Sequence, residues 1–379
     1  MNQIRVLSIF GTRPEAIKMA PVVKALEQNP AIDSRICVTA QHREMLDQVL
    51  ELFNLLPDID LDIMKPDQSL AALTANLFTH LDPVLVEEKP DWVLVQGDTT
   101  TVMAASLSAF YRGIRVGHVE AGLRTGDKYH PFPEEINRQI TSVIADLHFA
   151  PTDFARANLL HEGIPDRRIR VTGNTVIDAL NHIIDTPMPA QVEQWLQLWG
   201  IEKNHRRLVL VTAHRRENFG LPIRQICQAL RVLSERFGSE VQFVYPVHLN
   251  PNIQQPVHEI LAGLENVHLV DPLDYLSLIH LMKSATLVLT DSGGIQEEAS
   301  GLGKPTLVLR EVTERPEGLQ AGVLKLVGAD PEKIINETTR LLEDEAAYAR
   351  MAQATNIFGD GKAAGRIVDA LVTFTEHPV

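Results

Sequence analysis

Short apolar runs rich in β-branched residues alternate along this chain with longer amphipathic stretches. The short runs predict buried strands, and apolar positions spaced three to four residues apart in the longer stretches predict helices. The clearest predicted helices are Pro14–Gln28, Leu70–Glu88, Thr101–Tyr111 and Pro222–Arg236. The predicted strands are Arg5–Phe10, Arg35–Ala40, Trp92–Gln96, Arg115–Val119, Leu147–Ala150 and Arg168–Thr172 in the first half, and Leu208–Thr212, Val241–Tyr245, Val267–Val270, Thr286–Thr290, Pro305–Leu309 and Val323–Val327 in the second.

Alternation of this kind over the whole length is typical of parallel sheets wrapped by helices. Two sets of about six strands predict two doubly wound, Rossmann-like α/β domains, because a single sheet of all these strands would be unusually wide. The boundary is expected between the strand ending near Thr172 and the one starting at Leu208. We therefore predict a first domain at residues 1–174 and a second at 175–362. A last helix at about 363–379 has no strand after it and is predicted to pack back on the first domain.

The composition is that of an ordinary globular protein, with 45% hydrophobic and 22% charged residues. A formal net charge of -14 argues against nucleic acid or an anionic membrane as a partner, and the basic residues cluster in a few loops, which suits a small anionic ligand. Cys37 and Cys227 show no metal or redox spacing and are predicted to be packing thiols in a reducing compartment. No apolar run approaches a membrane span and no signal-peptide pattern is present, so we expect a cytoplasmic protein.

One stretch, Thr286–Glu298, combines a buried strand, a turn of small residues and a helix predicted to open at Ile295. The turn leaves backbone N–H groups uncovered at a helix N-terminus, where the helix dipole favours an anion. These groups belong to Ser292, Gly293 and Gly294. Glu298 follows about one turn later, where a carboxylate can accept hydrogen bonds from a ribose diol. The combination indicates a nucleotide diphosphate site, and the alternative is an ordinary βα loop whose glycines only make the turn.

Ligands of doubly wound sheets bind beyond the carboxyl ends of the strands. After the first strand, Pro14 is placed to start a helix, so Arg13 lies at a helix N-terminus where phosphate can bind, with Lys18 nearby. The alternative is a capped helix start with solvated charges. Asp98 follows the third strand, and for that motif alone an N-cap of the next helix is the simpler interpretation.

Further carboxylates follow the next strand. Glu120 ends it directly before Ala-Gly, where we identify no capping role, so a role in a site is favoured. In the Pro-rich loop that comes next, Glu134 and Arg138 are four residues apart at a helix start, a spacing that also fits a plain ion pair. These positions place carboxylates mainly on the first domain.

Basic groups gather at the strand ends of the second domain. His214 stands beside Arg215 and Arg216 directly after a buried strand, and such a group requires an anion or a carboxylate nearby. Later loops add Arg310 and Arg315. We expect the two carboxyl edges to face each other across a cleft, with carboxylates mostly from the first domain and phosphate binders mostly from the second.

Several common sites are missing from the sequence. There is no G-x-G-x-x-G after the first strand and no G-x-x-x-x-G-K-[ST] loop. Asp58–Asp62 alternates carboxylates with Ile and Leu, which is explained more simply by the solvated face of a short strand than by a metal-diphosphate site. His118 and Glu120 share a strand face, but nothing supplies a third metal ligand. We predict neither NAD nor a required metal.

Several motifs, in this order, resemble those of one bacterial family. They are Gly11–Lys18, Gln41–Met45, Gly97–Thr100, Val119–Arg124, Pro133–Glu135, His214–Glu217 and Asp291–Glu298. From about residue 4 to about residue 371, the chain is similar to the non-hydrolysing UDP-N-acetylglucosamine 2-epimerases. The resemblance implies a glycosyltransferase-B-like fold, in which two Rossmann-like domains surround a deep cleft and the second binds UDP, usually in a homodimer.

The implied reaction interconverts UDP-N-acetylglucosamine and UDP-N-acetylmannosamine through elimination of UDP to a 2-acetamidoglucal and re-addition of UDP. The product would feed bacterial surface polysaccharide synthesis. The implied catalytic group is Asp98, Glu120, Glu134 and His214. The implied UDP-sugar contacts are Arg13, Lys18, Arg138, Ser292, Gly293, Gly294, Glu298 and Arg315. A second, activating UDP-N-acetylglucosamine site is implied at Gln41, His42, Arg43, Gln68 and His248.

Two questions stay open at this point. The chain has Leu273 and Leu278 where some members place a glutamine and an aromatic residue near the uracil, so it departs from the pattern at the base. Which carboxylate removes the C2 proton and which returns it is also undetermined.

Alternative functions are a hydrolysing epimerase, a retaining glycosyltransferase of the same fold, and a nucleotide-sugar sensor. The last two leave the first-domain carboxylates without a purpose.

Overall fold

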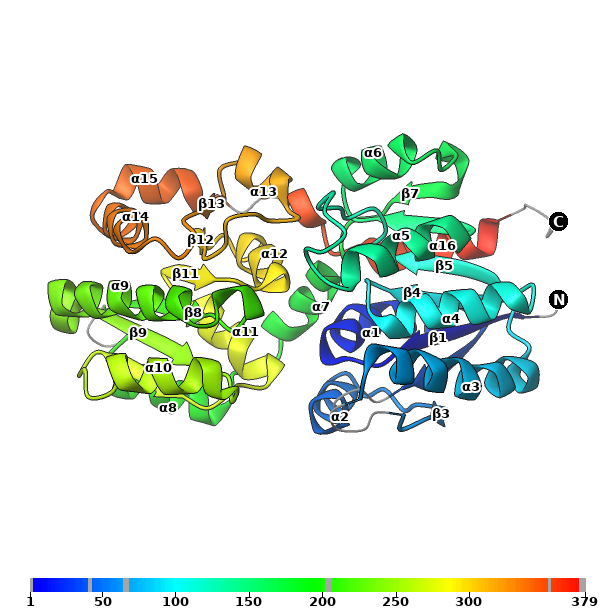
Figure 1. Ribbon diagram of the computed structural model, residues 1–379, viewed down its shortest axis with the longest axis horizontal. Coiled ribbons are helices and arrows are strands. Elements are labelled where there is room, and N and C mark those ends of the chain that lie inside the picture. Colours follow the sequence, from blue (N-terminus) through cyan, green and yellow to red (C-terminus); the bar gives the residue numbers. More distant parts are fainter. Residues whose placement is uncertain (1–2, 40–42, 64–67, 202–205, 354–355, 375–379) are drawn as a thin grey trace. The chain divides into compact units, whose positions relative to one another are not determined.

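The computed structural model describes residues 3–39, 43–63, 68–201, 206–353 and 356–374. The chain divides into two compact units, Met1–Asn181 with Phe358–Val379 and His182–Ile357 (Figure 1). The division follows Asn181 rather than residue 174, because the start of α7 (Thr175–Ile184) is bound to the first unit. There the carboxylate of Asp178 accepts hydrogen bonds from the backbone N–H groups of Ala363 and Ala364.

Seven strands of the described residues form the sheet of the first unit, in the order β3-β2-β1-β4-β5-β6-β7, and every neighbouring pair is parallel. They are β1 (Ile4–Phe10), β2 (Ile32–Val38), β3 (Ile59–Asp60), β4 (Trp92–Gln96), β5 (Arg115–Val119), β6 (Leu147–Ala150) and β7 (Ile169–Val171). β3 lies within the predicted alternation Asp58–Asp62, and its Asp60 is exposed, so the interpretation as a short strand with a solvated face is confirmed. The parallel register brings the carboxyl ends of β1, β4 and β5 to one edge.

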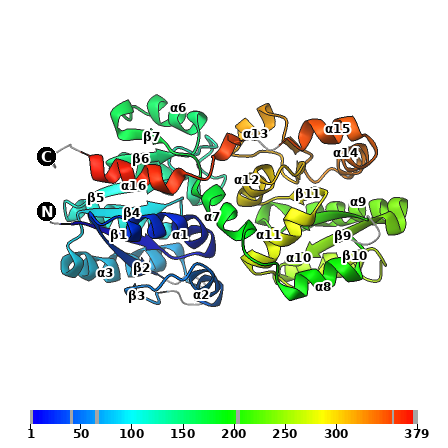
Figure 2. The same cartoon turned by 180° about the vertical axis from the view of Figure 1, so that it is seen from behind.

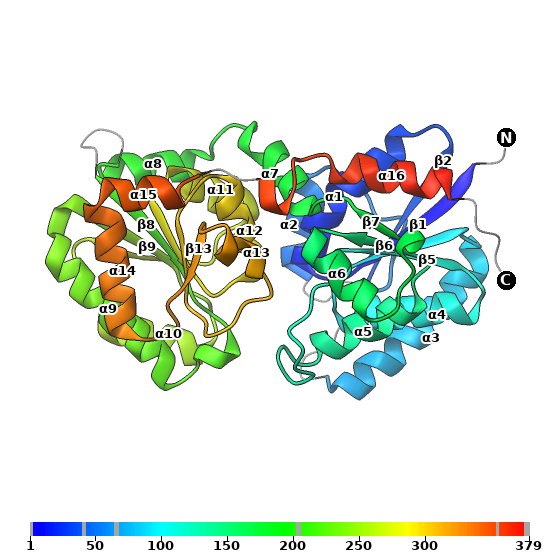
Figure 3. The same cartoon turned by 90° about the horizontal axis from the view of Figure 1, so that it is seen from above.

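The helices of the first unit are α1 (Arg13–Gln28), α2 (Arg43–Leu52), α3 (Leu70–Glu88), α4 (Thr100–Tyr111), α5 (Glu134–Ile144), α6 (Asp153–His161), α7 and α16 (Ala363–Thr373). Figure 3 shows α1 and α16 on one face of the sheet and α3, α4 and α5 on the other. Leu77 and Leu81 of α3 are fully buried in the core between α3, α4 and the sheet. α16 lies beside α1 (Figure 2), and the ring of Phe374 meets that of Trp92 edge-on with centroids 5.1 Å apart. These contacts hold α16 on the first unit.

The second unit has, in its described part, a six-stranded parallel sheet of order β10-β9-β8-β11-β12-β13. Its strands are β8 (Arg207–Thr212), β9 (Val241–Pro246), β10 (Val267–Val270), β11 (Leu287–Thr290), β12 (Thr306–Val308) and β13 (Leu324–Leu326). Its helices are α8 (Ala190–Leu198), α9 (Leu221–Phe237), α10 (Pro251–Leu261), α11 (Tyr275–Ser284), α12 (Gly293–Gly301), α13 (Pro316–Gln320), α14 (Pro331–Glu343) and α15 (Glu345–Met351). Phe243 and Leu289 are among the fully buried side chains where α9, α10 and α14 cover the sheet.

The predicted class, two doubly wound α/β domains, is confirmed, and every predicted strand is present with small shifts at its ends. β2 begins at Ile32 rather than Arg35, because its first residues also pair with β1. Cys37 and Cys227 are buried free thiols, as expected for packing residues. Nowhere in the described part of the chain is a helix both long and apolar enough to cross a membrane.

Candidate active site

The loop after β1 starts α1 with a reciprocal cap. The Thr12 hydroxyl accepts a hydrogen bond from the Glu15 N–H (3.4 Å), and Oε2 of Glu15 accepts from the N–H groups of Gly11 (2.9 Å) and Thr12 (2.7 Å). Oε1 of Glu15 accepts from the Thr99 hydroxyl at 2.6 Å, which ties this loop to the one after β4. Burial raises the pKa of Glu15. Arg13 is the first residue of α1, the predicted place for a phosphate contact.

Glu120 follows β5 at the centre of this edge, and its backbone φ of +65° lies in the left-handed region. The ammonium of Lys18 donates to Oε1 of Glu120 at 2.5 Å, and Nδ2 of Asn174 donates to the same oxygen at 3.0 Å. The side-chain amide of Gln96 donates to Oε2 of Glu120. Lys18, predicted to contact the UDP-sugar, thus forms a buried ion pair with a predicted catalytic carboxylate.

Asp98 does not cap the helix that follows it. The N-cap of α4 is Thr99, whose hydroxyl accepts a hydrogen bond from the Val102 N–H at 3.3 Å. The capping interpretation of Asp98 is therefore wrong, because α4 begins one residue later than that role requires. The Asp98 carboxylate instead binds the guanidinium of Arg138, and Nδ2 of Asn137 donates to the Asp98 carbonyl at 3.0 Å. Two residues of α5 therefore fix the loop after β4.

The start of α5 is anchored by a fully buried carboxylate. Glu135 accepts hydrogen bonds from the N–H groups of Thr125 (3.2 Å) and Gly126 (3.3 Å) and from the guanidinium of Arg138 (3.1 Å). Arg138 therefore bridges Glu135 and the loop after β4 in addition to its predicted part in substrate binding. Glu134, the first residue of α5, is half-buried beside this network. The predicted carboxylates of the first unit all lie on loops or helix starts.

Two buried histidines support the same edge from within the sheet. The register pairs His118 of β5 with His148 of β6, and Nε2 of His118 lies 2.7 Å from the Gly97 carbonyl. Burial lowers the pKa of His118 to about 4 and that of His148 to about 3, so both are neutral at pH 7. Among the residues that the structure describes, no group of three or more His, Cys, Asp or Glu side chains is placed to hold a metal ion.

In the second unit, α12 begins at Gly293 with Ser292 as its N-cap, so the predicted start at Ile295 is wrong. The guanidinium of Arg315 occupies the space beside Gly293, which favours a residue without a Cβ at that position. A Cβ on Gly293 would lie 2.6 Å from a guanidinium nitrogen of Arg315, whereas Gly294 has nothing within 4 Å. The N–H groups of this first turn lie at a helix N-terminus, as an anion site requires.

Carboxylates of the second unit balance its arginines. Arg315 donates to Glu297 at 2.8 Å and to Glu314 at 3.3 Å. Arg310 donates to Glu314 at 3.0 Å and to Glu217 at 2.5 Å. These networks lock Arg315 against the first turn of α12. Both arginines are therefore paired with carboxylates of the same unit, and Glu314 binds both of them.

His214 is held by the residue that precedes the glycine turn. Oδ2 of Asp291 accepts hydrogen bonds from the N–H groups of His214 and Arg215, both at 2.8 Å, and from Nδ2 of Asn218 at 2.9 Å. Oδ1 of the same carboxylate lies 3.7 Å from Nδ1 of His214. The His214 ring also stacks on that of His248, with centroids 5.6 Å apart. The structure therefore places His248, assigned to the activator site, beside the predicted catalytic His214.

The remaining predicted binding residues are only partly placed. Gln41, His42 and the side chain of Arg43 lie outside the described residues, and Gln68 is half-buried just before α3. Glu298 is buried within α12. Leu273 and Leu278 stand where some family members place a glutamine and an aromatic residue near the uracil. Leu278 is buried in α11, and Leu273 is half-buried just before it.

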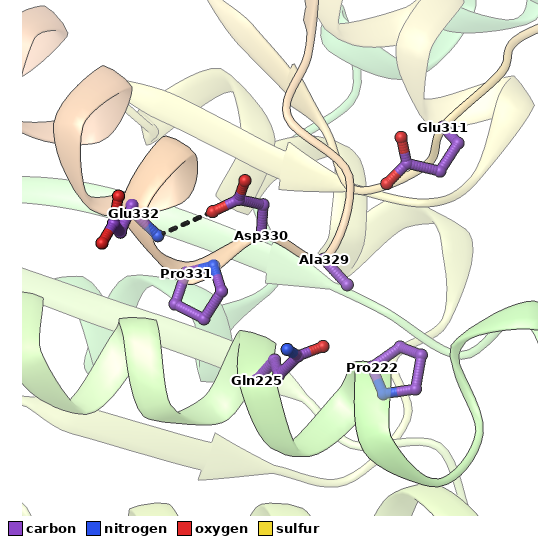
Figure 4. Close-up of a pocket in the computed structure, with 7 residues that line it drawn as sticks. All are labelled: Pro222, Gln225, Glu311, Ala329, Asp330, Pro331 and Glu332. Carbon is purple, nitrogen blue, oxygen red and sulfur yellow. Dashed lines mark hydrogen bonds between the residues drawn. The ribbon is translucent and has the colours of Figure 1, made fainter.

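A separate depression of the second unit lies beyond β12 and β13 (Figure 4). It is lined by Pro222, Gln225, Glu311, Ala329, Asp330, Pro331 and Glu332. Oδ1 of Asp330 accepts the Glu332 N–H at 3.0 Å, the bond drawn in Figure 4. The acidic side chains make this depression unsuitable for a phosphate, and none of its residues belongs to the predicted site.

Sequence reasoning missed three side chains that contact the predicted catalytic group. Gln96 and Asn174 bind Glu120, and Asp291 binds the His214 backbone. All three follow or end a parallel strand, so the same rule about carboxyl ends could have found them. What the rule does not supply is the partner of each side chain.

The fold and these strand ends define a class: a two-domain, doubly wound α/β protein with carboxylates at the strand ends of one unit and, on the other, a glycine-containing helix N-terminus that is the predicted anion site. The sequence pattern of one family, UDP-N-acetylglucosamine 2-epimerase, matches residues 24–372. The chain belongs to this family.

Known relatives resemble the chain over nearly its whole length. The UDP-N-acetylglucosamine 2-epimerase of Yersinia pestis is 56% identical over 370 residues, which cover 97% of this chain and 98% of the relative. The crystal structure of UDP-GlcNAc 2-epimerase from Neisseria meningitidis bound to UDP-GlcNAc is 49% identical, with a TM-score of 0.93 over 98% of this chain and 100% of that one. The Methanocaldococcus jannaschii UDP-GlcNAc 2-epimerase in complex with UDP-GlcNAc and UDP is 35% identical, with a TM-score of 0.83 over 97% of this chain and 99% of that one.

Proposed function

We propose that the protein interconverts UDP-N-acetylglucosamine and UDP-N-acetylmannosamine without net hydrolysis, and that the product feeds bacterial surface polysaccharide synthesis. The observation that carries the proposal is the gathering of Asp98 and Glu120 at adjacent strand ends in a member of this family. The relatives whose structures contain UDP-GlcNAc or UDP support the substrate.

The chemistry explains why carboxylates and an anion site are both needed. The proton at C2 of the sugar is not beside a carbonyl group, so a side-chain base cannot remove it unaided. The C1–O bond to UDP breaks first or concurrently, and loss of the C2 proton to a carboxylate then leaves a 2-acetamidoglucal and UDP. Return of a proton to the opposite face and re-addition of UDP at C1 complete the inversion. Each proton transfer to a positioned group is typically worth ~10²–10⁴-fold.

In this proposal the second unit holds the leaving group. The N–H groups of Ser292, Gly293 and Gly294 and the fixed guanidinium of Arg315 stabilise the diphosphate as negative charge develops on it. Glu298 accepts the ribose hydroxyls. Asp98, Glu120 and Glu134 move the C2 proton, and His214 assists at the same substrate. Retention of UDP after the bond breaks separates this enzyme from a hydrolysing epimerase.

The test is incubation with UDP-N-acetylglucosamine in D2O, with EDTA present and with no acceptor sugar or NAD. We expect UDP-N-acetylmannosamine carrying deuterium at C2, because the proton is exchanged with solvent and the reaction needs neither metal nor NAD. Net release of UDP and free N-acetylmannosamine would support the hydrolysing alternative. Recovery of unchanged, unlabelled substrate would overturn the proposed function, and activity restored only by added metal would overturn its metal independence.

We also propose that the protein is a homodimer of the cytoplasm. An exposed apolar face on α4 and α5 supports self-association: Phe110 is 60% exposed, Tyr111 70% and Val143 83%. Val143→Asp should shift the mass measured by light scattering from dimer to monomer, whereas Val171→Asp, at an exposed valine of β7, should leave it unchanged. A monomeric wild-type protein would contradict the proposal.

An activating UDP-N-acetylglucosamine site at Gln41, His42, Arg43, Gln68 and His248 remains part of the proposal. If this site is present, the initial rate of the reverse reaction, which starts from UDP-N-acetylmannosamine, should depend cooperatively on added UDP-N-acetylglucosamine. Initial rates that follow a simple hyperbola and do not respond to that addition would remove it.

A further inference from the structure

We propose that Gln96 and Asn174 are positioning residues that hold the Glu120 carboxylate ionised and in one orientation for proton transfer at C2. The inference rests on the epimerisation proposed above, because it takes Glu120 as one of the groups that move that proton. It extends the site by two neutral amides, one at the end of β4 and one beyond β7.

The two amides donate to different oxygens of Glu120. Nδ2 of Asn174 lies 3.0 Å from Oε1, and the amide of Gln96 donates to Oε2. Lys18 adds a cationic donor to Oε1 at 2.5 Å. An ionised carboxylate only accepts hydrogen bonds, so donors on both oxygens stabilise its negative charge. Because both amides are almost completely buried, removal of either leaves an acceptor in surroundings where water replaces it poorly.

The backbone also requires this support. Glu120 has a φ of +65°, which is unfavourable for a residue with a Cβ and persists only where surrounding contacts hold it. The adjacent loop is fixed by the Gly97 N–H, which donates to the Val119 carbonyl at 3.0 Å, and by His118 on the Gly97 carbonyl. With the backbone fixed, the two amides together with Lys18 set where the carboxylate points.

The orientation of the Asn174 amide follows from its own contacts. Its Oδ1 accepts the Val176 N–H at 3.1 Å at the start of α7, which leaves Nδ2 to face Glu120. Its backbone N–H donates to the Phe358 carbonyl at 2.6 Å, where the chain has returned from the second unit. Asn174 is therefore held through its side chain by the start of α7 and through its backbone by Phe358.

Asn174→Asp is the sharpest test because it preserves shape and the acceptor for Val176 while replacing the donor with an oxygen. Two carboxyl groups at this separation share a proton, since both cannot ionise at low cost. We expect kcat at pH 7 to fall at least ~10-fold and the acid limb of the kcat profile to move up by at least about one pH unit. The Kd for UDP, measured by calorimetry, should stay within about threefold of wild type, because UDP binds mainly to the other unit in the proposed function.

Gln96→Glu repeats the test on Oε2 and should move the acid limb in the same direction. It also carries the test if Asn174→Asp lacks a cooperative thermal transition. Asn174→Ala should lower kcat and move the acid limb up by less than Asn174→Asp does, because it removes a donor from the ionised carboxylate but adds no carboxyl group. Asn29→Asp is the matched control: the half-buried Asn29 uses Oδ1 to accept the Ala31 N–H at 3.0 Å in a solvent-exposed hydrogen bond, and its substitution should change neither kcat nor the profile.

Two results would overturn the positioning role. One is that the Asn174→Asp and Gln96→Glu variants both fold and both keep the wild-type kcat and pH profile. The other is a loss of kcat accompanied by equal losses of UDP affinity and thermal stability without a shift of the limb, which is what a merely structural role produces. Failure of the proposed function itself is separate, because the wild-type protein would then incorporate no deuterium at C2.

Discussion

Oδ1 of Asp291 lies 3.7 Å from Nδ1 of His214, and Oδ2 of the same carboxylate accepts the His214 backbone N–H at 2.8 Å. Asp291 is fully buried, and Asn218 also donates to its Oδ2, so the carboxylate cannot shift without losing several hydrogen bonds. Asp291 thus anchors the His214 backbone and turns one ring nitrogen toward itself. A carboxylate beside an imidazole nitrogen is a common arrangement at functional histidines.

Asp291→Asn should lower kcat by about 10–100-fold, because the negative charge beside the His214 imidazole is lost. UDP affinity should change less than kcat if His214 takes part in the chemistry. The measurement is kcat across pH together with calorimetric UDP binding, with the exposed Asp271→Asn as control. Parallel losses of affinity and kcat would instead assign Asp291 to leaving-group binding.

Glu134→Gln should reduce turnover at least ~10²-fold with a modest change in UDP affinity, because the substitution removes a group proposed to carry the C2 proton. Steady-state kinetics and calorimetry check it. Loss of UDP binding with surviving turnover of the bound fraction would show that Glu134 does not act in the chemistry.

Lys18→Met should be costly for both stability and turnover. Breaking a buried ion pair leaves the Glu120 charge without its cation, for which about 3–5 kcal/mol of unfolding free energy is typical. The matched control is Lys24→Met in the same helix, since the Lys24–Glu27 pair is exposed and such pairs contribute about 1 kcal/mol or less. Urea unfolding of the two variants measures the difference. Equal effects would show that burial of the Lys18–Glu120 pair does not govern its strength.

Adjacent glycines of α12 should respond to alanine in opposite ways. A Cβ on Gly293 would meet the Arg315 guanidinium, which Glu297 holds in place, so Gly293→Ala should destabilise the protein by about 1–3 kcal/mol. Gly294 has open space beside it, and Gly294→Ala should stabilise the helix by about 0.5–1 kcal/mol. Thermal unfolding without UDP separates the two effects. A Gly293→Ala variant as stable as Gly294→Ala would contradict the close packing of Arg315.

The buried histidines should make stability fall as the pH falls below about 6.5. Burial lowers the pKa of His118 to about 4 and of His148 to about 3, so between those values and 6.5 the unfolded chain binds protons that the folded chain does not. In this range each such histidine contributes up to about 1.4 kcal/mol per pH unit to the slope of the unfolding free energy against pH, and that free energy rises as the pH rises. The contribution is fully present above pH 6.5.

His148→Phe should remove one of these slopes, which unfolding in urea at pH 5, 6 and 7 can measure. Burial raises the pKa of Glu15 and acts in the opposite direction, so the difference between variant and wild type isolates the histidine. The exposed His161→Phe should leave the slope unchanged. An unaltered slope in His148→Phe would show that His148 is not a buried neutral group.

Much of the architecture could be predicted because it depends on local patterns. Alternating apolar periodicities identify strands and helices wherever they occur, and parallel pairing brings every strand's carboxyl end to one edge. That rule was sufficient to nominate Asp98, Glu120 and His214 from their positions after strands. Their roles in catalysis belong to the proposed function.

The chain alone therefore determined the two α/β domains, the strand ends that carry polar groups and the family to which the motifs belong. Only the tertiary structure decided the partners: Asn174, 54 residues from Glu120 in sequence, donates to its carboxylate, and Lys18, 102 residues away, donates to the same oxygen. It also decided that Thr99, not Asp98, caps α4. The physical reason is that periodicity reports which face of an element is buried, whereas a hydrogen bond depends on side-chain positions set by the packing of segments distant in sequence.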